Sequence, residues 1–178
     1  MRAWWLATLL SLVVIPAVAD VKKGIEAYEQ TNFADALQEF RPLAEAGQPE
    51  AQYYLGMLYG NGEGVHQNDA QAAKWYKKAA DQGLQPAQHN LGLLYILGQG
   101  VPQDYTQAYL WLSLAAAQKS GDWTASARMR DLVAVHFAPA QLASAQRRLQ
   151  EWRPQAQATA NVDTIADINI RKTAAEMR

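Results

Sequence analysis

The sequence predicts an all-α protein, a right-handed α-solenoid of about four helical hairpins. The first observation is an internal repeat at an offset of 36 residues, which carries Ala51 onto Ala87 (87 − 51). The second is that apolar residues recur three and four positions apart within each copy. The third is composition, because Ala and Gln are abundant while Val and Ile are sparse after the first residues, which favours helices over sheets.

The repeat extends over two neighbouring stretches of the chain. The segment from Ala51 to Tyr59 lies over the segment from Ala87 to Tyr95. The matched positions further along the two copies are Gly62, Gly64, Ala72, Trp75, Ala79 and Ala80 with Gly98, Gly100, Ala108, Trp111, Ala115 and Ala116. A single hairpin cannot bury its apolar faces, so neighbouring copies are expected to stack around a continuous core.

Each copy reads as two helices joined by a glycine-containing turn. In the first copy, one apolar stripe runs from Ala51 to Tyr59 and a second from Ala72 to Ala80. The run 60–64 between them has three glycines, which allow the positive φ angles of a tight turn. Pro49 and Pro86 stand at expected helix starts, where the missing amide donor costs nothing.

Two glycines fall in the middle of expected helices. Gly56 and Gly92 each cost about 1 kcal/mol relative to Ala at such a position. We therefore expect a partner helix to press against the backbone there. Trp75 and Trp111 are the residues predicted to fill the opposing space.

These residues form the pattern A-x-x-x-L-G-x-x-Y-x-x-G-x-G-V followed by A-x-x-W-x-x-x-A-A-x-x-G, which resembles Sel1-like repeats, relatives of the tetratricopeptide repeat. Nearly complete copies fit at about 48–83 and 84–121. The shorter copy at about 21–47 looks more like a plain tetratricopeptide hairpin, and 122–153 looks like a degenerate cap. The expected core of the copy at about 21–47 consists of Tyr28, Ala36, Phe40 and Leu43. The degenerate cap ends in a helix through Leu142, Ala145, Leu149 and Trp152.

The two ends of the chain differ from this repeat domain, which spans 20–153. Residues 1–19 read as a signal peptide, with Arg2, an apolar stretch and the small-residue site Ala17-Val18-Ala19. A membrane anchor is the alternative, but the apolar stretch is shorter than the ~20 residues of a span. We therefore expect a periplasmic or secreted protein with no stable membrane anchor after cleavage. Residues 154–178 read as a linker and a tail, which either frays or folds on a partner.

The sequence shows no pattern typical of a catalytic or metal centre. The formal net charge is -1 and no Lys/Arg stripe occurs, which argues against nucleic acid as a partner. There is no Cys, and His66, His89 and His136 lie far apart, so no metal or other cofactor is expected. No Gly-x-Ser-x-Gly nucleophile motif occurs, and the glycines at 60–64 lack the Lys-Ser/Thr of a phosphate loop. We expect a protein that is not an enzyme.

The resemblance implies a concave groove, lined by the first helices of the hairpins, that receives a partner protein or peptide. The positions expected to face it are Tyr53, Met57, Asn61, His89, Leu93, Ile96 and Leu97. Their apolar character suits protein recognition, or else the C-terminal hairpin or tail covers them. The expected function is an exported interaction adaptor. The alternative is a cell-wall or glycan-binding module, for which Tyr53 is the only clear aromatic candidate.

Overall fold

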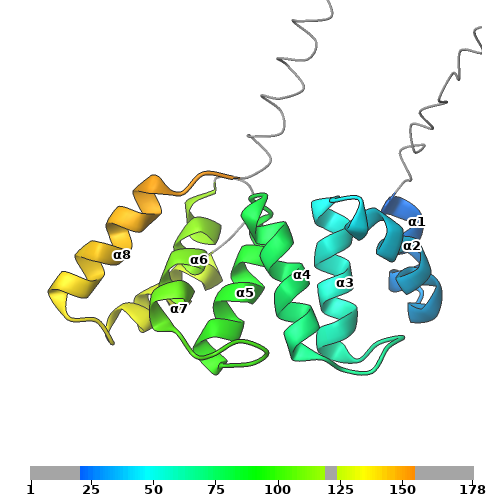
Figure 1. Ribbon diagram of the computed structural model, residues 1–178, viewed down its shortest axis with the longest axis horizontal. Coiled ribbons are helices and arrows are strands. Elements are labelled where there is room, and N and C mark those ends of the chain that lie inside the picture. The colour runs from blue at the N-terminus through cyan, green and yellow to red at the C-terminus, as the bar shows by residue number, and fades with distance from the viewer. Residues whose placement is uncertain (1–20, 119–123, 155–178) are drawn as a thin grey trace, which may run out of the picture.

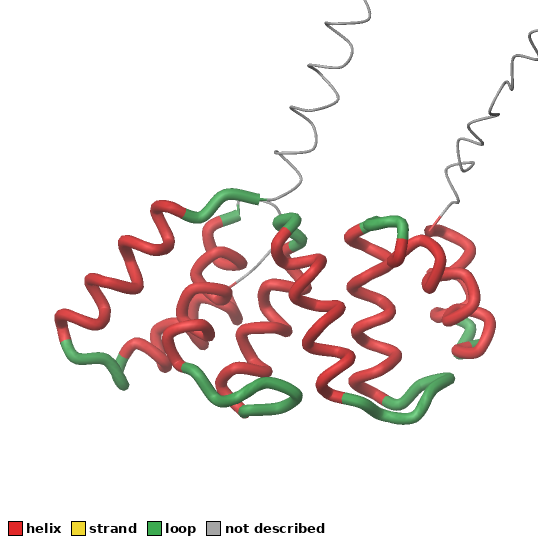
Figure 2. The backbone as a smooth tube through the Cα atoms, in the orientation of Figure 1, coloured by secondary structure: helices red, strands yellow, loops and turns green. Residues whose placement is uncertain are grey.

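The computed structural model describes residues 21–118 and 124–154, which form eight α-helices paired as four hairpins (Figure 1). The helices are α1 (Val21–Glu29), α2 (Phe33–Glu45), α3 (Pro49–Asn61), α4 (Asp69–Asp81), α5 (Gln85–Leu97), α6 (Tyr105–Ala117), α7 (Thr124–Ala134) and α8 (Pro139–Glu151). Figure 2 shows helices and loops without a strand in the described part. The prediction of an all-α solenoid of helical hairpins is confirmed. The predicted signal peptide and most of the predicted tail lie outside the described residues.

The helices form two layers. Each helix from α1 to α6 packs on the next along the chain, and α8 packs on α6 as well. The first helices of the hairpins also meet one another: the rings of Tyr28 on α1 and Tyr54 on α3 lie 5.4 Å apart. Further along, His89 Nδ1 on α5 lies 2.8 Å from Ser126 Oγ on α7. Long loops connect α3 to α4 and α5 to α6 at the lower edge of Figure 1, and short turns connect α2 to α3 and α4 to α5 at the upper edge.

Capping residues set the ends of the helices in the two central hairpins. Pro49 stands in the first turn of α3, and Gly62 ends this helix in the left-handed region with φ of 72°. The Asn68 side chain accepts a hydrogen bond from the Gln71 amide at the start of α4 (3.0 Å). Asp104 caps α6 in the same way. Gly60, expected in the turn, belongs to the last turn of α3.

The core consists of three apolar clusters, each formed where neighbouring hairpins meet. The buried side chains of the first include Phe40, Leu43, Leu55, Leu58 and Trp75, and those of the second include Tyr76, Leu91, Leu110, Trp111 and Leu114. The third, between α6 and the last hairpin, has Tyr109, Leu112, Val133 and Ala145. The core therefore runs continuously along the array, as expected for stacked repeats.

The two mid-helix glycines meet different residues from those predicted. A Cβ atom placed on Gly56 would lie 2.7 Å from the Tyr76 ring, and one on Gly92 would lie 2.7 Å from Leu112 Cγ. The prediction that Trp75 and Trp111 fill these spaces is wrong by one residue. One residue is about 100° around a helix, so residue 76 faces α3 of its own hairpin while Trp75 packs into the cluster of the preceding hairpin.

Two alanine substitutions in α3 should have opposite effects on stability. Gly56→Ala improves helix propensity by about 0.5–1 kcal/mol but forces the buried Tyr76 ring aside, at about 1–3 kcal/mol for overpacking. We expect a net loss of about 1–2 kcal/mol in the free energy of unfolding. Gly60→Ala meets Ala72 Cβ at an ordinary 3.5 Å and should gain about 0.5–1 kcal/mol. Urea unfolding measures both, and a Gly56 variant as stable as the parent would refute this packing account.

Paired glutamines connect the hairpins at the upper edge. Gln52 Nε2 on α3 donates to the carbonyl of Ala44 on α2 at 3.1 Å. Gln82, just after α4, donates both to Gln52 Oε1 at 2.8 Å and to the Gly47 carbonyl at 2.9 Å. The amides thus tie α4 to the turn between α2 and α3.

The same arrangement recurs 36 residues later (88 − 52 and 118 − 82). Gln88 donates to the Ala80 carbonyl at 3.2 Å, and Gln118 donates to Gln88 Oε1 at 3.2 Å and to the Gly83 carbonyl at 2.8 Å. We call these two pairs, Gln52–Gln82 and Gln88–Gln118, the glutamine relay. Gln52 and Gln88 are buried, so their amide groups depend on these partners.

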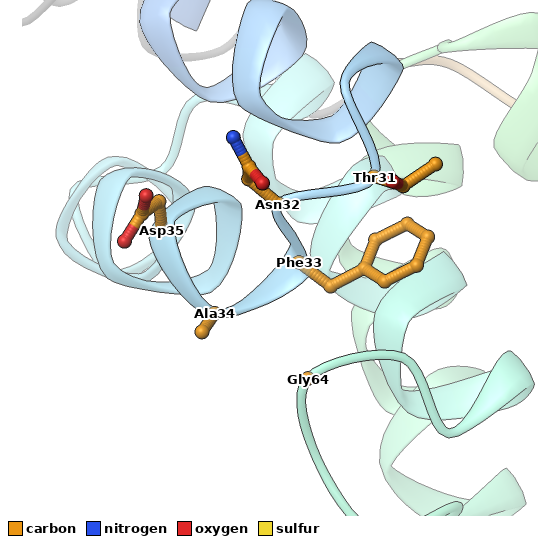
Figure 3. Close-up of a pocket in the computed structure, with 6 residues that line it drawn as sticks. All are labelled: Thr31, Asn32, Phe33, Ala34, Asp35 and Gly64. Carbon is orange, nitrogen blue, oxygen red and sulfur yellow. The ribbon is translucent and has the colours of Figure 1, made fainter.

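Close backbone contacts join the hairpins at the lower edge. Gly64, in the loop after α3, lies against the start of α2, where an added Cβ would be 2.7 Å from the Phe33 carbonyl oxygen (Figure 3). Gly100 lies in the same way against the Asp69 carbonyl at the start of α4, 36 residues on in both partners (100 − 64 and 69 − 33). The next equivalent pair is Tyr105 and His136, whose rings stack at 4.5 Å and 6°. We call these three contacts the loop contacts.

Candidate functional site

Three of the seven predicted partner-binding residues lie together at one pocket. Asn61 from the end of α3 and Leu93 and Leu97 from α5 line it. Its volume is about 240 Å³. The other lining residues are Gly60, Gln67, Asp69, Ala72, Tyr76, Asn90, Leu94 and Gln99. We call this the α3–α5 pocket.

The α3–α5 pocket has an apolar wall and a polar rim. Leu97 is 62% exposed, one of three large hydrophobic side chains in the described residues that are so open, and Ala72 and Tyr76 are buried. Asn61, Gln67 and Gln99 at the rim are exposed. Amide side chains both donate and accept hydrogen bonds, so the rim can bind a polypeptide backbone while the leucines take an apolar side chain.

Tyr53 and Met57 occupy a different environment. Both are half-buried and pack against the central core cluster. The Tyr53 ring lies 5.5 Å from the ring of Tyr54 and 5.8 Å from that of Tyr76. Tyr53 therefore contributes to the fold, and a charged substitution there is expected to destabilise it.

A tyrosine–glutamate contact lies next to the pocket. Glu63 Oε2 accepts hydrogen bonds from the Tyr28 hydroxyl at 3.0 Å and from Asn61 Nδ2 at 3.2 Å. Burial, the hydrogen bond to Glu63 and the charge of Glu63 raise the pKa of Tyr28 to about 12. Burial also raises the pKa of Tyr53 and Tyr76. These hydroxyls therefore stay protonated and neutral at physiological pH.

The last hairpin covers the remaining two predicted residues. His89 meets Ser126 of α7, and Ile96 packs against the cluster formed with α7 and α8. The C-terminal hairpin, one of the two alternatives named for covering the predicted binding residues, therefore covers His89 and Ile96. The part of this face that stays uncovered lies beside α3 and the end of α5.

Stability should fall as the pH falls toward 5, in part through His89. Burial lowers the pKa of His89 below 6.5, because the charged form is desolvated. The unfolded chain then binds more protons than the folded one between the lowered pKa and 6.5, so the free energy of unfolding rises with pH in that window. Chemical denaturation from pH 5 to 7.5 measures this slope. His89→Gln should reduce it while His66→Gln, at an exposed loop position, should not; equal slopes would contradict the assignment.

Sequence reasoning missed the pocket residues that come from outside the first helices. Gln67 and Asp69 come from the loop and the start of α4, and Tyr76 reaches the pocket from within α4. Asn90, on α5 itself, was also missed, although the other copy has Tyr54 at that place (90 − 36) and such a change from an aromatic to a polar residue indicates a special contact. Hydrogen bonding from Asn90 acts to lower the pKa of Tyr53 and Tyr76, opposing the larger effect of burial.

The described residues offer no metal site and no membrane span, but they form a second pocket. Among residues 21–118 and 124–154, no group of three His, Cys, Asp or Glu side chains is placed to hold a metal ion. None of the helices that the structure describes has both the length and the apolar character needed to cross a membrane. A second pocket, of about 360 Å³, lies at the start of α2 between Thr31, Asp35 and Gly64 (Figure 3).

Comparison with known proteins identifies the repeats. The family model described as the Sel1 repeat matches residues 49–84 and 85–120. The chain is similar to c5321, a protective antigen present in uropathogenic Escherichia coli strains that displays an SLR fold: TM-score 0.70 and 30% identity, over 81% of this chain and 32% of that one. It is also similar to a Sel1 repeat protein from Oxalobacter formigenes, with TM-score 0.60 and 33% identity over 65% of this chain and 46% of the other.

The chain thus spans less than half the length of either solved structure. No curated protein matches it. Both similar structures and the family model indicate the same repeat, and helices α3 to α6 are the ones that lie in the matched residues. Residues 49–120 of the chain thus consist of two Sel1 repeats.

Proposed function

We propose that the protein is an exported adaptor that binds a partner protein or peptide in the groove formed by the first helices of its hairpins. Sel1-like repeat proteins mediate protein–protein interactions. The observation that carries the proposal is the α3–α5 pocket, which combines exposed Leu97 with a rim of amide side chains. The proposed role is binding without catalysis.

The pocket's size and composition favour a protein partner over a small ligand. Its volume of about 240 Å³ falls below the roughly 300–1,000 Å³ of typical small-molecule sites. It suits a few side chains of a larger partner, and an exposed leucine beside polar groups is common at protein interfaces. No specific observation favours the glycan-binding alternative, because Tyr53 packs into the fold.

Site-specific photocrosslinking in the native cell tests the proposal. A photoreactive amino acid at Leu97 should capture one dominant protein, whereas the same group at Lys74, exposed on α4, should not. Leu93→Asp in the crosslinking chain should abolish capture while circular dichroism shows the helices intact. Equal capture from both positions, or capture that persists in the Leu93 variant, would refute binding at the pocket.

The proposed export rests on the sequence pattern of residues 1–19 and has its own test. Cell fractionation should place the protein in the periplasm or the medium, with Asp20 as the first residue of the mature chain. An intact N-terminus in the cytoplasmic fraction would refute export without affecting the adaptor role.

A further inference from the structure

The charged residues on α3, on α5 and in the loops that follow them are all of one sign. The segments 49–69 and 85–104 supply α3, α5 and the loops beside them, and they contain four carboxylates and no Lys or Arg. The carboxylates are Glu50, Glu63, Asp69 and Asp104. A surface of this kind attracts cations and repels anionic ligands.

One of these carboxylates lines the pocket, and a second lies next to it. Asp69 lines it, and its Oδ1 accepts a hydrogen bond from Gln67 Nε2 at 3.3 Å. Glu63 is joined to the rim through Asn61 at 3.2 Å. Within residues 21–118 and 124–154 the ion pairs are Lys77–Asp81 and Arg130–Asp131, so neither pocket carboxylate has a described cation partner. Both can therefore pair with a cation on a ligand.

The lysines of the central hairpins all lie on α4, in the other layer. Lys77 pairs with Asp81 at 2.7 Å, and Lys78 lies 4.2 Å from the centre of the Trp75 ring. These residues and Lys74 belong to α4 and are exposed there. In the two central hairpins, α3, α5 and the loops that follow them therefore carry only carboxylates, whereas α4 carries the lysines.

From this we propose, building on the adaptor function above, that the α3–α5 pocket recognises a basic, apolar peptide segment: a Leu-, Ile- or Met-like side chain next to Lys or Arg. Leu93, Leu97 and Ala72 contact the apolar side chain. Asp69 and Glu63 pair with the neighbouring cation, and the exposed amides bind the backbone. Charge complementarity of this kind selects among partners more than it raises affinity.

Peptide selection with the purified protein tests this inference. Immobilised protein is used to select binders from a phage library of random dodecapeptides. Enriched sequences should place Lys or Arg beside Leu, Ile or Met. The strongest binder is then synthesised, and its Kd is measured by fluorescence polarisation for the parent, Asp69→Asn, Glu63→Gln and the control Glu39→Gln, which removes an exposed carboxylate from α2.

Each pocket variant should weaken binding about two- to five-fold, the range for an exposed ion pair, and added salt should reduce the difference. The control should bind like the parent. Asn68 caps α4 in Asp69→Asn, so the fold should persist, and thermal melting checks this. Binders without a basic residue, or binders insensitive to both pocket substitutions, would overturn the basic-peptide inference and leave the adaptor function standing. Failure to enrich any peptide would count against both.

Discussion

Replacing Gly100 with alanine should destabilise the protein by about 2–5 kcal/mol, more than any other single-methyl addition considered above. The residue has φ of 68°, in the left-handed region, and its added Cβ would overlap the Asp69 carbonyl at the start of α4. Left-handed backbone costs an alanine about 1–2 kcal/mol. The overlap involves backbone, which no side-chain rotation can relieve, and adds about 1–3 kcal/mol.

Gly47 provides the matched control for this prediction. Its φ of 97° is further from the left-handed minimum, yet nothing lies within 4 Å of an added Cβ. Gly47→Ala therefore has the backbone strain without the collision, and we expect a loss of about 1–2 kcal/mol. Urea unfolding of both variants separates the cost of the left-handed backbone from the cost of the collision. Equal losses would mean that the loop at Gly100 moves away freely and that the loop contact contributes little.

Replacing Gln88 with leucine should cost about 1–3 kcal/mol in the free energy of unfolding. The buried Gln88 amide donates to the Ala80 carbonyl and accepts from Gln118, and leucine of similar size can do neither. The Gln118 amide then loses one of its two acceptors in a half-buried place.

Two further variants make this result specific to the glutamine relay. Gln52→Leu should cost a similar amount, because Gln52 has the equivalent buried position and partners. Gln150→Leu on the exposed side of α8 should change stability by less than about 0.5 kcal/mol. If Gln88→Leu were as stable as the parent, the relay would be a by-product of the packing rather than a contributor to it.

The repeat made most of the fold predictable from the sequence. Helices α3 and α5 begin at or next to the predicted prolines and end at the predicted glycines, because each signal acts locally on the backbone. Which side chains of the second helices face the partner helix was harder to predict. Trp75 and Tyr76 are adjacent, large and buried, and sequence spacing alone does not say which faces α3.

The candidate site was predictable only where the repeat continues. Leu93 and Leu97 were found because their stripe recurs, whereas Asp69 and Gln67 reach the pocket through a loop whose path depends on tertiary contacts. The cover over His89 and Ile96 comes from the last hairpin, whose sequence departs from the repeat. Because the last hairpin has no matching copy in the repeat, its position could not be inferred from the sequence.

The third loop contact has a consequence for how the protein opens. The first two loop contacts, at Gly64 and Gly100, bring backbone against backbone between the first three hairpins. At the last hairpin the side chains of His136 and Tyr105 stack instead. Side chains at an exposed edge separate more readily than interlocked backbone, so we expect α7 and α8 to detach before the rest of the array unfolds. Such fraying would uncover His89 and Ile96 on α5 and lengthen the surface that a partner can bind.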